Sequence, residues 1–333
     1  MPETLFADPA HWLPLVFASL MGLAILIYVC LDGFDLGVGV LTPFATAEER
    51  DMMIASIGPF WDANETWLVL AVGLLLVAFP VAHGVVLTAL YLPVALMLSG
   101  LILRGVAFEF RAKAPAARRP LWDKAFFVGS FATTLAQGYM LGLYIMGLET
   151  TVLTFAFACL TALCLTAGYA YIGAAWVLMK TDGVLRMKAI GWARRALAGL
   201  VLGFAAISIA SPLASGRIFD KWFGWPEMLA LAPLPVLAAV LVLMAWRQLT
   251  VGLSDFGPFF CGVGLFILAF LGLAYSFFPY VVPDRITIFE AASAPESLFV
   301  ILIGAVFVVP AILGYTALAY WIFRGKATRL SYD

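Results

Sequence analysis

Charged residues and histidine are scarce in this chain. Asp, Glu, Lys and Arg together make up 12% of its 333 residues, two residues are histidine, and 64% are hydrophobic. A soluble domain has about 25% charged residues and is about half apolar. The composition therefore excludes a soluble globular protein and indicates an integral membrane protein. The sequence also lacks a basic patch interleaved with aromatic residues, so a nucleic-acid partner is not expected.

The cysteine spacing of a metal or redox motif is missing as well, and no secretory leader is expected. The four cysteines lie in apolar runs without CxxC spacing: Cys30, Cys159, Cys164 and Cys261. They are predicted to be small apolar side chains rather than disulfides or metal ligands. The first twelve residues contain Glu3 and Asp8 but no Lys or Arg. This is the wrong charge for a secretory signal peptide, so the first apolar run is expected to remain as a helix.

Long apolar runs take up most of the chain. A helix needs about 20 apolar residues to cross roughly 30 Å of hydrocarbon. Nine runs meet this length, near residues 13–36, 54–79, 82–103, 124–146, 152–179, 195–212, 227–245, 257–280 and 298–323. The connections are short. The sequence therefore predicts an all-α, polytopic membrane protein of about nine transmembrane helices, with residues 1–333 as one integral membrane domain.

The basic residues predict the orientation. Most of the 19 Lys and Arg residues fall between the third and fourth runs, between the fifth and sixth, or after the ninth, while Arg217, Lys221 and Arg285 lie on the other side. The basic side is cytoplasmic by the positive-inside rule. Nine spans then place the N-terminus outside and the C-terminus in the cytoplasm. The aromatic-rich segment near 213–226 is expected to lie in the outer membrane interface.

Four acidic residues stand clearly inside the apolar runs. Asp32 and Asp35 are three residues apart, and so are Asp62 and Glu65, a spacing that puts each pair on one helical face. At 1.5 Å per residue, Asp62 is expected about 12 Å inside the cytoplasmic face and Asp32 about 6 Å from it. Asp62 is therefore expected to be the deeper of the two.

A charged acid facing lipid near mid-membrane costs up to about 3 kcal/mol. Protonation, a bound cation, a water-filled path or basic groups on a partner subunit would each remove this cost, and helix capping is the plain structural alternative. A proton relay combines protonation with a water path. A cation-coupled transporter and a scaffold for a redox partner are the competing functions. The residues alone leave these alternatives open.

Four neighbours of the acids complete the candidate site. Trp61 and Trp67 flank the second acid pair, with Asn64 between them, and buried indoles need a hydrogen-bond partner that Asp62 or a partner chain would supply. Arg104 ends the third run. It is either a basic anchor that extends to the membrane surface or a counter-charge to the acids. The Gly37–Val38–Gly39 sequence lacks the strand–turn–helix setting of a dinucleotide fingerprint.

Several segments resemble a known family. Leu-Asp-Gly-Phe-Asp-Leu-Gly-Val-Gly (31–39) and Gly-Pro-Phe-Trp-Asp-Ala-Asn-Glu-Thr-Trp-Leu (58–68) resemble the signature segments of subunit II of the cytochrome bd-type quinol oxidases. The segments 101–111, 278–283, 291–298 and 320–326 also fit, so the resemblance covers nearly the whole chain. The length is similar to that of the shorter branch, which includes the cyanide-insensitive oxidases. Phe289-Glu290 departs from a Trp-Asp-like pair.

The resemblance implies a haem-free subunit that pairs with a haem-bearing subunit I in the bacterial cytoplasmic (inner) membrane. Subunit I would hold haem b558, haem b595 and haem d or a substitute haem, and the complex would oxidise quinol and reduce O2 to water with cytoplasmic protons. The two histidines agree, because several haems need several axial ligands. No cofactor is predicted in this chain, although the resemblance leaves open a structural quinone and a small single-helix subunit.

The resemblance also implies residue roles. Asp62 matches the family's proton-route Asp, and Trp67 matches a Trp that lines oxygen entry in some members. Glu65, Asp32 and Asp35 would support Asp62, and Trp61, Asn64 and Arg104 would surround the acids.

Overall fold

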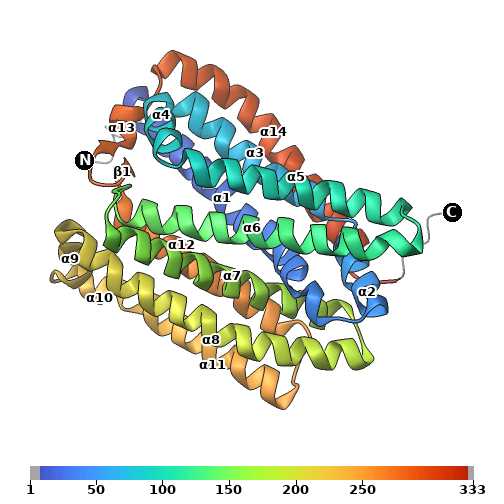
Figure 1. Cartoon of the computed structure of the whole chain (residues 1–333). Helices are drawn as coiled ribbons and strands as arrows, with labels where there is room; N and C mark the ends of the chain where they lie inside the picture. Colours follow the sequence, from blue (N-terminus) through green and yellow to red (C-terminus); the bar gives the residue numbers. More distant parts are fainter. Residues whose placement is uncertain (1–7, 329–333) are drawn as a thin grey trace.

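The computed structural model describes residues 8–328, and nearly all of them are helical (Figure 1). Nine helices are long: α1 (Pro9–Leu41), α3 (Trp61–Ala78), α5 (Tyr91–Lys113), α6 (Arg119–Ile145), α7 (Val152–Lys180), α8 (Gly183–Ala214), α11 (Pro233–Val251), α12 (Gly257–Phe277) and α14 (Pro295–Ile322). Glu3 and Arg329, both used in the charge analysis, lie outside the described residues.

Short elements connect the long helices. They are η1 (Thr42–Phe44), α2 (Ala47–Ile57), α4 (Pro80–Ala89), η2 (Ala116–Arg118), α9 (Gly216–Phe223), α10 (Glu227–Leu231) and α13 (Ile288–Ala291). An antiparallel hairpin of β1 (Tyr280–Val282) and β2 (Ile286–Thr287) lies between α12 and α13. The segment 213–226, expected in the membrane interface, is largely the short helix α9 and the turn after it.

Among residues 8–328, eight helices are long and apolar enough to cross a membrane. The expected run 124–146 does not meet that test, although it forms α6, a helix of 27 residues packed against α5 and α7. The reason is that α6 carries polar residues inside the bundle. Ser130, Thr133 and Thr134 are fully buried within protein rather than exposed to lipid. The predicted all-α polytopic architecture is confirmed.

Three expected spans are divided between two helices, and in one of them the run 227–245 covers α10 and the first part of α11, on either side of Ala232. The run 54–79 is divided, because α2 ends at Ile57 and α3 begins only at Trp61. A capping box between Thr46 and Glu49 starts α2, so this helix has its own N-terminus and precedes the membrane helix. The run 82–103 spans α4 and the first part of α5, which meet at Leu90.

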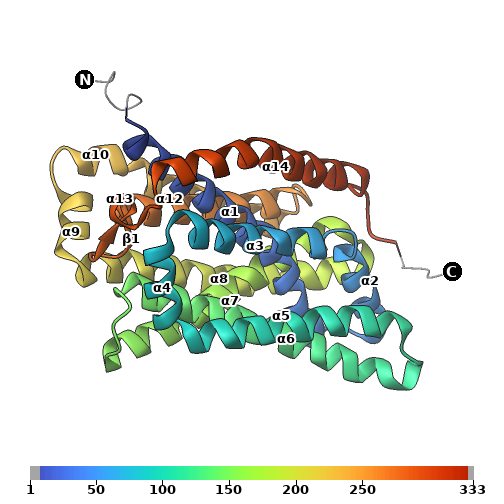
Figure 2. The same cartoon turned by 90° about the horizontal axis from the view of Figure 1, so that it is seen from above.

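The long helices run side by side, and α1 lies among them, packed against α3, α6 and α7 (Figure 1). Viewed from above, α14 lies along one side of the bundle and α5 and α6 along the opposite side (Figure 2). The short helix α2 and the last turns of α14 lie at one end of the bundle. The helices α9, α10 and α13 and the start of α1 lie at the other (Figure 1). Which end is cytoplasmic stays a prediction from the basic residues.

Glycines allow α1 to approach its neighbours closely. A Cβ atom on Gly37 would lie 1.8 Å from the backbone oxygen of Tyr169, and one on Gly173 would lie 2.5 Å from the backbone carbon of Gly37. A Cβ atom on Gly39 would likewise lie 2.1 Å from Oγ of Ser130 in α6. Small residues at helix contacts are the usual means of close packing in membranes. These glycines therefore allow close contacts of α1 with α7 and with α6.

Candidate functional site

Asp32 and Asp35 lie inside the bundle, on the face of α1 toward α5, and both are 0% exposed. Asp32 Oδ1 accepts a hydrogen bond from Arg104 Nη1 at 2.7 Å, and Asp35 Oδ2 lies 3.9 Å from Arg104 Nη2. Arg104 itself is 1% exposed. Arg104 is thus a counter-charge to Asp32, one of the two roles that the sequence left open, and does not extend to the surface.

Close helix packing and an aromatic ring hold Arg104 in place. A Cβ atom on Gly129 of α6 would lie 2.7 Å from the backbone nitrogen of Arg104, so α5 and α6 touch at this level. The ring of Trp61 lies 6.0 Å from Arg104 Cζ, within the range of a cation–π interaction. Trp61 also packs on Phe108 with 4.9 Å between ring centres. Trp61 therefore supports the guanidinium from α3.

Asn64 connects Asp35 to the C-terminal helix. Its Nδ2 donates to Asp35 Oδ2 at 2.7 Å, and its Oδ1 accepts a hydrogen bond from the Tyr320 hydroxyl of α14 at 3.0 Å. The ring of Tyr320 stacks on Phe60 with 4.5 Å between centres. Tyr320 was not predicted as a site residue. Its only signal in the sequence is a polar hydroxyl near the C-terminal end of an apolar run.

The buried cluster has two carboxyl groups and one cation. No other Lys or Arg of residues 8–328 forms an ion pair with Asp32 or Asp35. Asp32 Oδ2 and Asp35 Oδ1 have no hydrogen-bond partner within the same residues. A buried charge without compensation costs several kcal/mol, so a proton on one carboxyl would balance the cluster. In the described part of the chain, no three His, Cys, Asp or Glu side chains gather as a metal site.

Asp62 does not lie in the middle of one continuous helix, as the sequence suggested. It lies in the first turn of α3, and its side chain is exposed. The expected depth of about 12 Å assumed one straight helix from residue 54, whereas α2 and α3 are separate helices. Asp32 and Asp35 are therefore the buried acids, and Asp62 lies at the surface of this chain.

Glu65 lies one helical turn after Asp62 and is half-buried. Side chains three residues apart on a helix are neighbours. Glu65 is thus intermediate in exposure between Asp62 and the buried pair. Its chain neighbour Asn64, which donates to Asp35, places this part of α3 beside the acids of α1.

Trp67 is buried, with 1% exposure, and packs with Tyr28 and Ala71. Its Nε1 has no hydrogen-bond partner within residues 8–328. Asp62, the partner suggested by the sequence, lies five residues earlier and therefore on another face of α3.

A buried chain of polar side chains adjoins the acids and was missed in the sequence. Gln137 Nε2 of α6 donates to the Tyr28 hydroxyl at 2.6 Å, and the Tyr169 hydroxyl of α7 donates to Gln137 Oε1 at 2.8 Å. Tyr28 precedes Asp32 by one helical turn. Gln137 is a polar residue in an apolar run, so the rule that identified the four acids would have found it too.

These features define the class: an all-α, multi-pass membrane protein with an ion-paired acid cluster among its helices. Residues 13–323 match the family model described as cytochrome bd terminal oxidase subunit II. The cytochrome bd-I ubiquinol oxidase subunit 2 of Escherichia coli K12 is 29% identical, with 93% of this chain and 94% of the relative aligned. The cytochrome bd ubiquinol oxidase subunit 2 of Bacillus subtilis is 30% identical, with 95% and 96% aligned.

A chain of the bd oxidase structure from Geobacillus thermodenitrificans has the same fold, with a TM-score of 0.77 over 93% of this chain and 98% of that chain, at 16% identity. The chain belongs to the cytochrome bd terminal oxidase subunit II family. The family resemblance drawn from the sequence is confirmed. So is the expectation of a subunit of a quinol:oxygen oxidoreductase complex in the bacterial cytoplasmic membrane.

Proposed function

We propose that this chain is the haem-free subunit of a quinol-oxidising terminal oxidase and conducts protons from the cytoplasmic side toward a haem-bearing subunit I. Quinol and O2 are the substrates of the complex, and the relatives in E. coli and B. subtilis are named as ubiquinol oxidase subunits. Haem b558, haem b595 and haem d or its substitute belong to subunit I. No residue is assigned to a structural quinone or to a small single-helix subunit.

The positions of the two histidines support the haem-free assignment. His11 is exposed near the start of α1 and contacts Asp8 at 3.1 Å. His83 lies on the short helix α4. Neither histidine belongs to the buried acid cluster, and an axial haem ligand is most often histidine or methionine.

One observation carries the proton-path proposal: two completely buried carboxyl groups share a single guanidinium. Arg104 compensates one carboxylate. The second carboxyl group has no cation of its own, so it can take up and release a proton with little change in the fold. The amide of Asn64, which donates to Asp35, suits the ionised form, and the Tyr320 hydroxyl fixes that amide.

The route begins at the exposed carboxyl of Asp62, continues to the half-buried Glu65 and reaches Asp32 and Asp35. Exposure decreases along this order, as a path from an aqueous face into a bundle requires. Asp62 is thus the entry of the path rather than its deepest member. The indole of Trp67 lies beside α1 one turn beyond Asn64 and is assigned, by family likeness alone, to the oxygen entry.

Substituting Asp62→Asn tests the route. We expect O2 reduction by the intact complex to fall at least about tenfold, since a positioned proton-transfer group contributes about 10²–10⁴-fold, while haem spectra and subunit assembly stay unchanged. Asp62→Glu restores a carboxyl group and should recover most turnover. Glu109→Gln is the matched control, because Glu109 is an exposed acid of α5 outside the cluster. Normal turnover in Asp62→Asn would refute the entry assignment.

The scaffold alternative predicts a different result from the same variants. If the acids only bind basic groups of subunit I, Asp62→Asn lowers the yield of assembled complex and leaves turnover per haem unchanged. The cation-coupled transporter alternative loses its support, because the chain matches an oxidase family over residues 13–323.

A further inference from the structure

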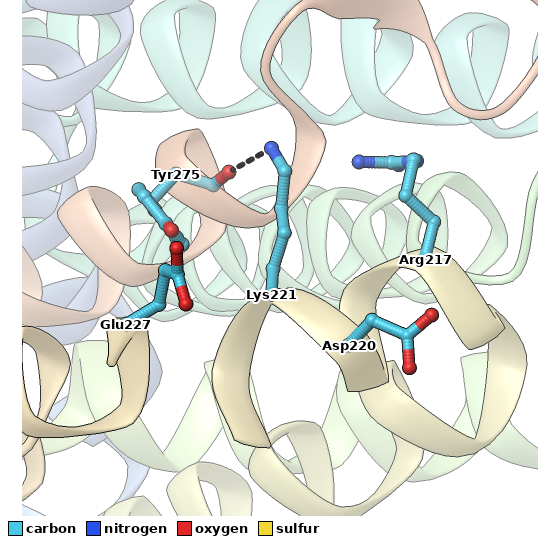
Figure 3. A pocket seen from close by; sticks show the side chains of 5 residues that line it. All are labelled: Arg217, Asp220, Lys221, Glu227 and Tyr275. Atoms are coloured by element: carbon cyan, nitrogen blue, oxygen red, sulfur yellow. Dashed lines mark hydrogen bonds between the residues drawn. The ribbon is translucent and has the colours of Figure 1, made fainter. Parts of the chain in front are cut away.

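A cavity of about 640 Å³ opens at the end of the bundle opposite to α2, beside the short helix α9. Five side chains line it: Arg217, Asp220, Lys221, Glu227 and Tyr275 (Figure 3). This end holds the few basic residues that the charge distribution assigns to the outer side. The cavity is remote from the acid cluster, and the proposed proton path does not use it.

Two cations of α9 are held in fixed positions at this cavity. Arg217 donates to Asp284 Oδ1 at 2.7 Å and to the backbone oxygen of Ser276 at 2.9 Å. Lys221, one helical turn later, donates to the backbone oxygens of Tyr275 and Phe278. The side chains are therefore preorganised, with little freedom left to lose on binding a ligand.

The arrangement of the cations favours an anion between them. Arg217 Nη2 is a buried donor without a partner within the described residues. Partial burial and the adjacent charge of Arg217 lower the pKa of Lys221. Like charges held together are unfavourable, and a phosphate group relieves that repulsion through charge-assisted hydrogen bonds.

The cavity also has a region that suits a cation. Neither Asp220 nor Glu227 forms an ion pair within residues 8–328. In Figure 3, Glu227 and the ring of Tyr275 lie on one side of Lys221, and Arg217 lies on the other. The Lys221 ammonium itself lies 5.1 Å from the centre of the Tyr275 ring. The unpaired Glu227 carboxylate is therefore the group that remains to attract a second ammonium.

The surroundings of the cavity indicate that its ligand comes from the membrane. On α9, Phe219 and Phe223 are 50% and 55% exposed, and Trp225 in the following turn is 73% exposed. Exposed aromatic residues at the end of a helical bundle are typical of the membrane–water interface. We propose that this cavity binds the zwitterionic headgroup of an aminophospholipid of the phosphatidylethanolamine class. The phosphate lies against Arg217 and Lys221, and the ammonium group lies against Glu227.

The test uses the purified oxidase complex in phosphatidylcholine nanodiscs doped with phosphatidylethanolamine or phosphatidylglycerol, with retained lipid counted by native mass spectrometry. Phosphatidylcholine lacks N–H donors and phosphatidylglycerol lacks the ammonium group, so we expect preferential retention of phosphatidylethanolamine. Glu227→Gln should weaken phosphatidylethanolamine retention about tenfold, the effect of one charge-assisted bond, and leave phosphatidylglycerol unchanged. Lys221→Gln should weaken both lipids.

Arg285→Gln and Glu296→Gln are the matched controls, because both residues are exposed, lie at the same end of the protein and do not line the cavity. They should retain lipid as the unsubstituted complex does. Unaltered haem spectra and melting temperature exclude misfolding of the two cavity variants. Equal retention of the two doped lipids, or unchanged retention in Glu227→Gln, would overturn the proposal. Equally tight binding of free phosphoethanolamine would assign the cavity to a soluble phosphate ester and overturn the lipid assignment.

Discussion

Replacing Arg104 by leucine isolates the energetic role of the only cation in the buried cluster. The guanidinium is 1% exposed and lies 2.7 Å from Asp32 Oδ1 and 3.9 Å from Asp35 Oδ2. Leucine fills part of the same volume but leaves two buried carboxyl groups without a positive partner. The protein must then protonate both carboxyls or admit water to them, and either response destabilises the packed bundle.

The expected cost follows from the burial of the pair. Removing one partner of a buried ion pair costs about 3–5 kcal/mol, whereas replacing both partners by neutral groups of similar size is often neutral or stabilising by about 1–4 kcal/mol. Arg104→Leu should therefore destabilise the protein strongly, and adding Asp32→Asn should recover a large part of the loss. The stability of Arg104→Lys should lie between that of the unsubstituted protein and that of Arg104→Leu, because a single ammonium group cannot reach both carboxylates as the two guanidinium nitrogens do.

The assay is the thermal stability of the assembled oxidase complex, followed by haem absorbance in membranes containing each variant. Asp32→Asn alone completes a double-mutant cycle. The melting temperature should be highest for the unsubstituted complex, lower for the double variant and lowest for Arg104→Leu. If Arg104→Leu melts with the unsubstituted complex, or if the double variant is no more stable than Arg104→Leu, then Arg104 does not compensate a buried charge and the charge inventory of the site is wrong.

Two further predictions concern the fold around the site. Gly37→Ala places a methyl group 1.8 Å from the backbone oxygen of Tyr169, so α1 and α7 must separate, and the yield of assembled complex should fall sharply; Gly73→Ala, where no atom lies within 4 Å of the added Cβ, should assemble normally. Asp255 accepts hydrogen bonds from Arg186 and from Lys326. These bonds, that of Arg186 above all, lower the pKa of Asp255 from the ordinary value of 3.8. Its contribution to stability is therefore complete above about pH 4 and is lost as the pH falls through the lowered pKa. The difference in melting temperature between the unsubstituted complex and Asp255→Asn, worth less than about 1 kcal/mol for a partly exposed pair, should shrink below about pH 4; a difference independent of pH would show that the Asp255 carboxylate is not stabilised by its ion pairs.

The helix that carries Asp62 shows where sequence reasoning failed, because the expected single span is two helices. The apolar run 54–79 is continuous in composition, so nothing in its hydropathy marks a boundary between two helices. The turn at residues 58–60 forms between α2 and α3, and it puts Asp62 in the first turn of α3 at the surface. The only local indication was Gly58-Pro59, a pair that often marks a turn.

The partner of Arg104 could not be assigned from the sequence for a different reason. Arg104 and Asp32 are 72 residues apart and lie on helices that meet only in the folded bundle. An arginine near the end of an apolar run extends to the surface or turns inward according to the helices packed around it. The glycine contacts of α5 with α6 decided the second outcome, by bringing Arg104 within reach of α1.

The sequence by itself determined the membrane class, the all-α architecture, the two-sided distribution of basic residues and the family, because hydropathy, charge and short motifs are local properties of the chain. It also identified all four acids of the candidate site, since a charged residue in an apolar run is conspicuous. Only the tertiary structure decided which acids are buried, that Arg104 compensates Asp32, and that Tyr320 and Gln137 join the site. Those properties depend on which helix faces are in contact, and contacts between distant helices are not recorded in any single stretch of sequence.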